Sequence, residues 1–280
     1  MTLKECIAGA EEKGAAVGHF NISNLEGFWA VVNASKKLSL PVIIGVSEGE
    51  RDFVGVRQVK ALVDTVKAEG LPIFLNADHT YSMERVKEVV DAGFDSVIID
   101  EAEKSTEENI KITKEAVEYA RSQNPEILVE AELGFIGKSS KVLDEMPDGI
   151  MLTNVEEAAR FVVETGVDLF APAVGNIHGM IKGGNPKLNI DRIRDIKQAV
   201  KIPLVLHGGS GITDLEFKEA IKAGISIIHI NTELRVAFRK GLQRSLAENM
   251  DEIAPYKYMK EALHDMQEVV ERRLALFSNL

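Results

Sequence analysis

Cysteine is nearly absent from this 280-residue sequence, because Cys6 is the only one. A single thiol excludes an intrachain disulfide and a thiolate-rich metal site, so any bound metal would need histidine and carboxylate ligands. No apolar run reaches the roughly 20 residues that a membrane-spanning helix needs. Residues 1–14 also lack the apolar stretch of a secretory signal. We therefore expect a cytoplasmic protein that does not bind membranes.

Positive charge is in deficit, since 33 Lys and Arg residues face 44 Asp and Glu residues, a formal net charge of −11. This balance argues against a nucleic acid as the main partner, although a local site could still bind a small anion. Apolar residues make up 45% of the chain, which is enough for a sizeable core. Because no linker or repeat interrupts the sequence, we expect one domain, residues 1–280.

Eight short apolar runs alternate with charged segments of helical periodicity. The runs are near-continuous in Val, Ile and Leu, which is typical of parallel strands buried on both faces. They cover residues 16–22, 41–47, 72–77, 96–100, 127–133, 168–173, 203–207 and 226–231. Strand and helix alternating eight times predict an α/β fold, the (β/α)8 TIM barrel, whose usual length of about 250 residues fits this chain.

The end of the chain, residues 233–280, is amphipathic and charged, with a break at Pro255. We expect two extra helices there, beyond what the eighth strand needs to cover it. The second carries an apolar stripe at helical spacing, comprising Met266, Val269, Val270, Leu274 and Phe277. Such a stripe packs on the barrel or on another subunit, and it is more often plain core.

Polar side chains gather at the carboxyl ends of the predicted strands, where TIM barrels build their active sites. Four of the six histidines lie there, namely His79, His178, His207 and His229. His79, His178 and His207 come from three different strands, and three neutral imidazoles with an open position form a known type of catalytic zinc site. Other divalent metals suit the same ligands, so Zn²⁺ is the leading choice. We assign structural roles to His19 and His264.

Glycine and serine follow the seventh predicted strand in the stretch His-Gly-Gly-Ser-Gly, residues 207–211. Asn231 and Thr232 follow the eighth strand and precede a helix. Phosphate sites in these barrels are often built from these two loops and a helix N-terminus. Lys182 could supply a cation to the same anion.

Asp78 directly precedes His79. A carboxylate there can exchange a proton with a substrate oxygen near the metal without being a ligand itself. The alternative, that Asp78 merely caps the helix beginning near Ser82, is less favoured. A metal, an adjacent acid/base and a phosphate cradle together suit carbanion or enediolate chemistry on a sugar phosphate.

Seven segments in the same order carry a resemblance to a known family. They are residues 20–21 with 24–26, 46–49, 78–79, 96–100 with 107–110, 129–134, 175–179 and 206–211. Their sequences resemble the class II, metal-dependent ketose-bisphosphate aldolases, which include fructose- and tagatose-bisphosphate enzymes. The likeness covers nearly the whole chain.

The resemblance implies a zinc-dependent lyase that reversibly cleaves fructose 1,6-bisphosphate to dihydroxyacetone phosphate and glyceraldehyde 3-phosphate through a metal-stabilised enediolate. It implies that the zinc ligands are His79, His178 and His207, with Asp100 and Glu132 at a second or displaced metal position. Asp78 would act on the C4 hydroxyl. The substrate and its phosphates would be bound by Asn24, Ser47, Gly179, Lys182, Gly208, Ser210, His229, Asn231, Thr232 and Arg235. A monovalent cation, Na⁺ or K⁺, and a homodimer or homotetramer are further implications.

Four features depart from the family's pattern. Asp100 is followed by residues 101–103, Glu-Ala-Glu, instead of the usual Ser-His. His229 stands where the motif usually has an asparagine that contacts the dihydroxyacetone moiety. Asn231 stands where fructose-type members often have Asp and tagatose-type members a small residue. Residues 137–140 lack the usual loop glutamate, for which Asp144 or Glu145 could substitute.

The sequence leaves other functions as alternatives. The nearest is an aldolase for tagatose bisphosphate or another sugar phosphate. A second is a metal-dependent hydrolase on the same barrel, in which the metal activates water. A third is a non-catalytic sugar-phosphate-binding protein, which the missing loop glutamate suggests.

Overall fold

Eight parallel strands close into a barrel in the computed structural model, which describes all residues from 1 to 280. Their order around the barrel is β1-β10-β9-β7-β5-β4-β3-β2. They are β1 (Val17–Asn21), β2 (Val42–Val46), β3 (Ile73–Thr80), β4 (Ser96–Ile99), β5 (Leu128–Leu133), β7 (Leu169–Pro172), β9 (Leu204–Leu206) and β10 (Ile225–Ile230). Each strand lies on one of the eight predicted runs, so the predicted TIM barrel is confirmed.

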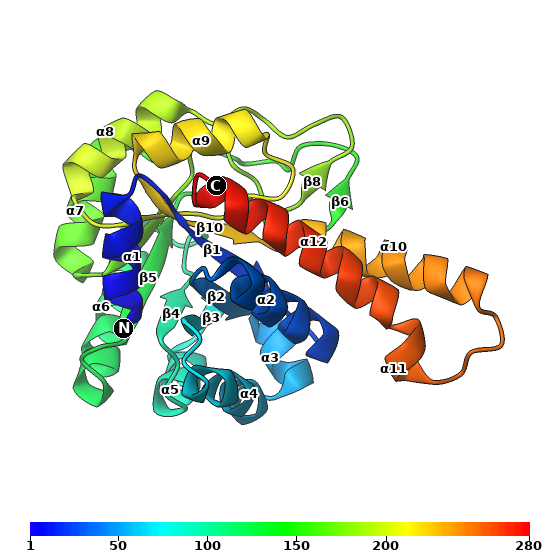
Figure 1. Ribbon diagram of the computed structural model, residues 1–280. Coiled ribbons are helices and arrows are strands. Elements are labelled where there is room, and N and C mark those ends of the chain that lie inside the picture. Colours follow the sequence, from blue (N-terminus) through cyan, green and yellow to red (C-terminus); the bar gives the residue numbers. More distant parts are fainter.

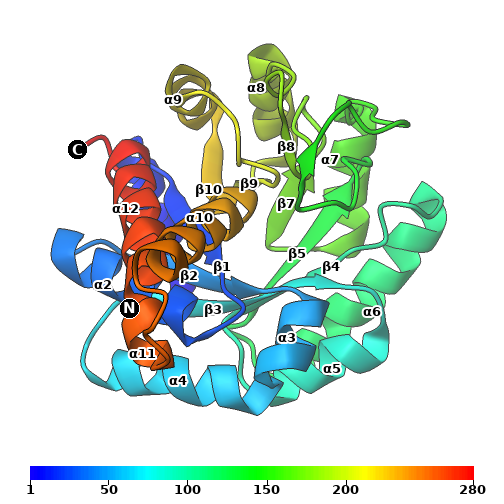
Figure 2. The same cartoon turned by 90° about the vertical axis from the view of Figure 1, so that its right-hand side faces the viewer.

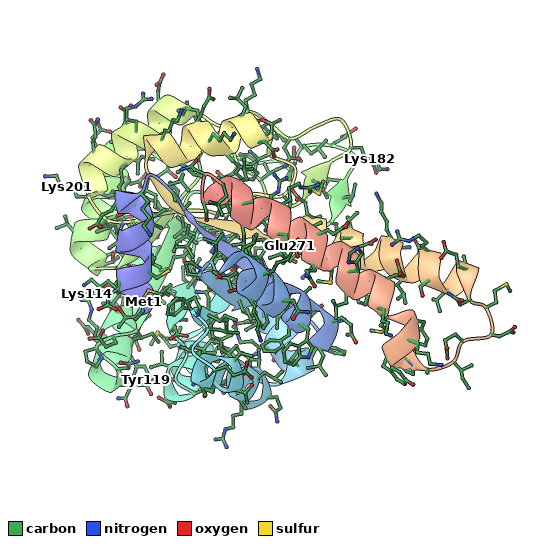
Figure 3. All side chains as sticks on the ribbon, in the orientation of Figure 1. Met1, Lys114, Tyr119, Lys182, Lys201 and Glu271 are labelled. Atoms are coloured by element: carbon green, nitrogen blue, oxygen red, sulfur yellow. The ribbon has the colours of Figure 1, made fainter.

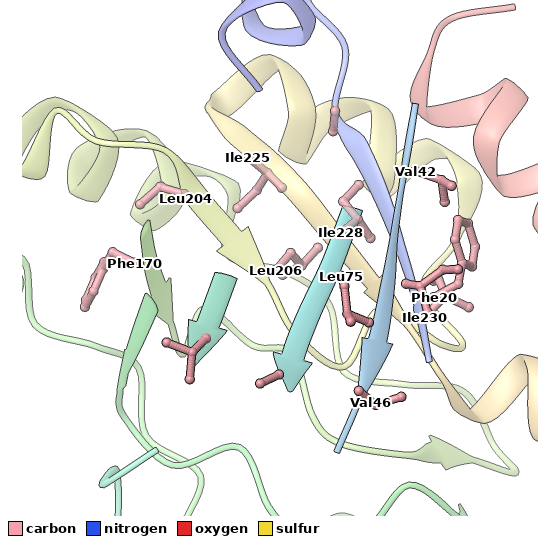
Figure 4. Packing of buried hydrophobic residues seen from close by; sticks show 14 of the residues in the cluster. Phe20, Val42, Val46, Leu75, Phe170, Leu204, Leu206, Ile225, Ile228 and Ile230 are labelled. Carbon is pink, nitrogen blue, oxygen red and sulfur yellow. The ribbon is translucent and has the colours of Figure 1, made fainter. Parts of the chain in front are cut away.

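Helices surround the barrel on its outside (Figures 1 and 2). They are α2 (Leu25–Leu38), α3 (Glu48–Val54), α4 (Val56–Ala68), α5 (Met83–Asp91), α6 (Thr106–Gln123), α7 (Val155–Thr165), α8 (Ile190–Val200) and α9 (Asp214–Ala223). Side-chain caps explain where several begin. At the start of α6, for example, Ser105 and Glu108 form a reciprocal capping box. The main apolar core lies between strands and helices and includes Leu75, Leu206 and Ile228 (Figure 4).

Helix α1 (Leu3–Glu12) has no counterpart among the helices expected from the sequence. Its Leu3, Cys6 and Ile7 form a second apolar cluster with residues of the barrel interior such as Ile43 and Phe74. The cluster fills the amino-terminal end of the barrel. The polar strand residues can therefore reach solvent only at the opposite end.

The inward-facing residues change in character along the strands. Successive side chains of a strand alternate between its two faces, so Val17 and His19 share the inner face of β1. On β5, Leu128 is followed on the same face by Glu130 and Glu132. Val17 and Leu128 belong to the apolar cluster, whereas the later residues are buried and polar. The interior is thus apolar at its amino-terminal end and titratable toward its carboxyl-terminal end.

Two long helices, α10 (Thr232–Glu248) and α12 (Lys260–Phe277), follow the barrel and are joined through the short α11 (Pro255–Tyr258). They project beyond the barrel as a hairpin (Figure 1). Helix α12 packs against α2 and α10 of the same chain. This packing buries the predicted stripe at Met266, Val270, Leu274 and Phe277, with Val269 partly buried. The stripe is therefore core.

A second, two-stranded sheet joins two loops above the barrel. Its strands, β6 (Val142–Leu143) and β8 (Met180–Ile181), pair in parallel. Strands of two residues leave no periodicity in a sequence, which explains why they were not predicted. Among the helices, none combines the length and the apolar character that a membrane crossing requires.

Candidate active site

A cavity of about 550 Å³ opens at the carboxyl ends of the barrel strands, where the sequence predicts the active site. Most of the predicted site residues line it: Ser47, Asp78, His79, Asp100, His178, Gly179, His207, Gly208, Ser210, His229, Asn231, Thr232 and Arg235. Asn24, Glu132 and Lys182 are not among the lining residues.

The rings of His79, His178 and His207 form one cluster, with centroids 4.9–5.9 Å apart. Each ring offers a nitrogen within 4.8 Å of those of the others. One nitrogen of each ring contacts an outer oxygen: His79 Nδ1 and Asp100 Oδ2 at 2.8 Å, His178 Nδ1 and Gly137 O at 2.6 Å, and His207 Nε2 and Glu130 Oε1 at 2.6 Å. When each of these oxygens accepts a ring proton, the other nitrogen of a neutral ring keeps a lone pair for a metal.

In the metal-free protein, His79 carries a positive charge. Burial would lower its pKa, but the carboxylates of Asp78 and Asp100 outweigh burial and raise the pKa to about 10. Burial lowers the pKa of His178 to about 4 and holds that of His207 well below its usual value. Two of the rings are therefore neutral, and the third must release a proton when a metal binds.

Glu132 forms a second set of potential ligands with His79 and Asp100. Its Oε2 is buried without a hydrogen-bond partner, and burial together with Asp100 raises the pKa of this carboxyl well above its usual value. A buried, unpaired acceptor beside imidazole nitrogens is one that a cation would satisfy. Nitrogen and oxygen donors without sulfur suit zinc and other divalent metals. The side chains of this cluster therefore fit a divalent metal ion.

The backbone at Asp78 and His79 departs from regular strand geometry. The register of β3 against β4 shifts between Ala77 and Thr80, and His79 has a φ of +91°. In a regular strand, neighbouring side chains point to opposite faces. The irregularity allows the adjacent Asp78 and His79 both to line the cavity.

The buried guanidinium of Arg51, on α3, contacts this irregular segment. Its Nη1 donates to Asp78 O at 2.9 Å and to Val46 O at 2.6 Å. Its Nη2 donates to His79 O and to Thr80 Oγ1, both at 3.2 Å. Arg51 thereby holds the two residues in their strained conformation. Sequence reasoning missed it, because an arginine in a helix is usually solvated.

Asp78 is placed to act as a base. Its Oδ2 accepts a hydrogen bond from Asn21 Nδ2 at 2.8 Å. Its Oδ1 lies 3.3 Å from His229 Nδ1 and 3.6 Å from His79 Nε2, with no aligned hydrogen bond. Burial alone would raise the pKa of Asp78, but His79 and His229 hold it well below its usual value. Asp78 is therefore ionised at neutral pH.

The loop after β9 lies against the N-terminus of α10. Ser210 Oγ accepts hydrogen bonds from Asn231 N at 3.3 Å and Glu233 N at 3.2 Å. Gly208 has a φ of +62°, and a Cβ there would lie 2.1 Å from Ile177 O, so only glycine fits. Backbone amides and the N-terminus of a long helix favour an anion at this edge of the cavity.

Besides Glu132, the structure leaves four residues named from the sequence outside the lining of the cavity. Lys182 has a side chain that is 66% exposed and pairs with Asp144 at 2.5 Å, at the edge of the molecule (Figure 3). Asn24 instead caps α2 by accepting from Gly27 N at 2.9 Å. Neither Asp144 nor Glu145, the proposed substitutes for a loop glutamate, lines the cavity.

Sequence reasoning assigned no specific role to several residues that the structure places at the site. Asn21 and Glu130 hold Asp78 and His207, respectively. Glu130 precedes Glu132 by two residues, so strand alternation could have placed it on the same face. Lys138 and Lys141 line the cavity from the loop after β5, where no periodicity identifies them.

Comparisons with known proteins agree over the full length of the chain. The family model described as class-II fructose-bisphosphate aldolase matches residues 1–279. A fructose-bisphosphate aldolase of Staphylococcus epidermidis is 37% identical over 282 residues, covering 99% of this chain and 96% of that protein. One from Staphylococcus aureus gives the same identity and coverage. The crystal structure of the YdjI aldolase from Escherichia coli K12 is 32% identical, with a TM-score of 0.84, covering 98% of this chain and 96% of that one.

Proposed function

This chain belongs to the class-II fructose-bisphosphate aldolase family and is a class II aldolase, and on that premise we propose that it reversibly cleaves fructose 1,6-bisphosphate to dihydroxyacetone phosphate and glyceraldehyde 3-phosphate. The observation that carries the proposal is the juxtaposition of the three-histidine cluster with the ionised Asp78 in one polar cavity. Cleavage beside a carbonyl needs an electrophile that stabilises the developing negative charge and a base that removes a proton, and a metal held by three imidazoles beside Asp78 would supply both.

The metal would be held by His79, His178 and His207, and zinc is the ion we propose. When bound, it supplies a Lewis acid that polarises the ketose carbonyl and stabilises the charge that develops on the triose fragment. Asp100, Gly137 and Glu130 orient the three rings through their outer nitrogens, as described above. The protein's own contribution is therefore a fixed set of tautomers around the metal.

Asp78 would remove the C4 hydroxyl proton as the C3–C4 bond breaks. Its low pKa keeps it ionised, and because Asn21 holds its Oδ2, a lone pair of Oδ1 can accept the proton. In the direction of synthesis the same carboxyl returns the proton to the new hydroxyl. The strained φ of His79 supports this assignment because it aims the base and a metal ligand at one point.

Two groups of lining residues suit the two phosphates of a bisphosphate. We propose that Gly208, Ser210 and the α10 N-terminus at Thr232 bind the C1 phosphate through backbone amides and hydroxyls. At another part of the wall, Arg235 lines the cavity and pairs with Glu50 at 2.7 Å. Arg235, with Ser47, would contact the distal phosphate.

The test is triose-phosphate release from fructose 1,6-bisphosphate by purified protein, before chelation, after chelation and after zinc is restored. The proposal predicts release that disappears with the chelator and returns with zinc. Release that is insensitive to thorough chelation would refute the metal assignment. Inorganic phosphate without triose would identify a hydrolase, and tight binding without turnover would identify a binding protein.

Variants separate the base from the metal site. Asp78→Asn, which keeps the shape but not the charge, should retain zinc and lose about 10²- to 10⁴-fold in kcat. His264→Asn, an exposed histidine on α12 far from the cavity, is the matched control and should be unaffected. Rates on fructose and tagatose bisphosphates measured side by side decide between the two substrate classes.

A further inference from the structure

His229 and His19 form a stacked pair inside the barrel, below the cavity. The two residues are register partners in the parallel pairing of β1 with β10. Their ring centroids are 3.4 Å apart and their planes differ by 2°. His19 is anchored from the other side, because its Nε2 donates to Asn76 Oδ1 at 3.2 Å. The His229 ring therefore rests on a second ring that is itself fixed by a hydrogen bond.

Gly45 on β2 provides the space that this arrangement needs. A Cβ at Gly45 would lie 2.0 Å from His19 Cε1 and 2.4 Å from His19 Nε2. Any side chain there would displace the His19 ring and, through the stack, His229. Residues of three adjacent strands are thus fitted to one another to hold a histidine where the family's motif usually has an asparagine.

The upper ring faces the base. His229 Nδ1 lies 3.3 Å from Asp78 Oδ1, and both atoms are buried with no other partner. The other carboxylate oxygen of Asp78 is already held by Asn21. Hydrogen bonds of catalytic groups are often long or misaligned without substrate and tighten when it binds. A hydrogen bond between His229 Nδ1 and Asp78 Oδ1 is therefore the remaining contact that can fix the rotation of the carboxylate.

A second metal ion is a poorer explanation of the same residues. His19, Asp78 and His229 do have ligand atoms within 4.8 Å of one another. However, the lone pairs of imidazole nitrogens lie in the ring planes, and two parallel stacked rings direct them side by side instead of toward one point. The pair can support a hydrogen bond from His229 but not a shared ion.

We propose that His229 is a positioning residue for Asp78: its Nδ1–H donates to Asp78 Oδ1 and fixes the carboxylate, while His19, accommodated by Gly45, fixes the His229 ring. This inference rests on the proposed role of Asp78 as the base. An asparagine at this position could also donate a hydrogen bond, but it has no ring to stack on His19.

The first test is a double-mutant cycle. His229→Phe keeps the ring and the stack but removes the donor, and it should lower kcat about 10- to 100-fold, the scale expected when a catalytic group is misplaced. KM and zinc content should change little. His229→Asn restores a donor and should recover part of kcat. In an Asp78→Asn background, His229→Phe should cause no further loss, because its effect passes through the carboxylate.

The outcomes are distinguishable. Full activity of Asp78→Asn alone would overturn the proposed function itself. If Asp78→Asn is impaired but His229→Phe lowers kcat by the same factor in both backgrounds, the positioning role is wrong and His229 acts independently. Equal kcat values for His229→Asn and His229→Phe would also overturn it, because restoring the donor would then have no effect.

A second measurement does not depend on how His229 variants fold. Long-range ¹H–¹⁵N spectra of the zinc-loaded protein labelled in histidine report which ring nitrogen carries the proton. The proposal predicts the Nδ1–H form of His229 in the parent protein and a changed Nδ1 signal in Asp78→Asn. An Nε2–H form in the parent protein would overturn it.

Discussion

Replacing Arg51 by methionine tests whether one buried side chain maintains the strained segment that carries Asp78 and His79. Methionine is of similar length and stays apolar, but it removes all four hydrogen bonds of the guanidinium. The acceptors left behind are neutral but buried, and at about 1–3 kcal/mol for each one left without a donor the total loss should be about 3–5 kcal/mol. The unfolding midpoint should therefore fall by roughly 10 °C.

The same substitution should weaken metal binding. Without the bonds to Asp78 O and His79 O, the φ of +91° at His79 loses its support and the ring loses its orientation. We expect zinc affinity to fall about 10- to 100-fold, as for lost outer partners of metal ligands. Competition with a chromophoric chelator measures this affinity, and thermal unfolding of the metal-free protein measures stability.

Arg85→Met is the matched control for Arg51→Met. Arg85 loses only partly exposed ion pairs with Asp52 and Glu88, which contribute at most about 1 kcal/mol. If Arg51→Met unfolds within 2–3 °C (roughly 1 kcal/mol) of the parent protein and binds zinc equally well, the claim that Arg51 holds this segment is wrong.

Two further predictions concern the metal cluster. Glu130→Gln replaces the carboxyl group that contacts His207 Nε2 at 2.6 Å by an amide, which is a weaker acceptor than a carboxylate. It should weaken zinc binding about 10- to 100-fold with the fold intact by circular dichroism, and unchanged affinity would contradict it. The metal-free protein should lose stability as pH rises from about 6.5 to about 10, because folded His79, with a pKa of about 10, retains a proton that the unfolded chain releases near 6.5. Denaturant midpoints across this range measure the trend, and a flat profile would refute it.

The barrel could be predicted because each strand is buried on both faces, so the sequence shows eight apolar runs. Helix α1 was missed because its apolar face is short, and only the structure shows that Cys6 and Ile7 close the barrel. The sequence locates side chains at strand ends, and His79, His178 and His207 do converge there.

The site was predicted less well where it depends on contacts inside the barrel or on the conformation of loops. His19 was assigned a structural role, and only the register of β1 with β10 shows that it stacks on His229. Lys182 follows a strand end as a phosphate ligand would, yet its side chain turns to Asp144. Position along the chain does not determine the direction of a flexible side chain, and that limits any prediction from spacing alone.

The small β6–β8 sheet ties the loop after β5, which lines the cavity, to the loop that carries His178. His178 N donates to Ile136 O at 2.8 Å, His178 Nδ1 to Gly137 O at 2.6 Å, and Met180 N to Lys141 O at 2.9 Å. This part of the cavity wall and the imidazole of His178 should therefore move together. The loop after β5 cannot swing outward as an independent lid without releasing or dragging the ring of His178. In this fold, a movement that widens the entrance also displaces His178, a proposed metal ligand.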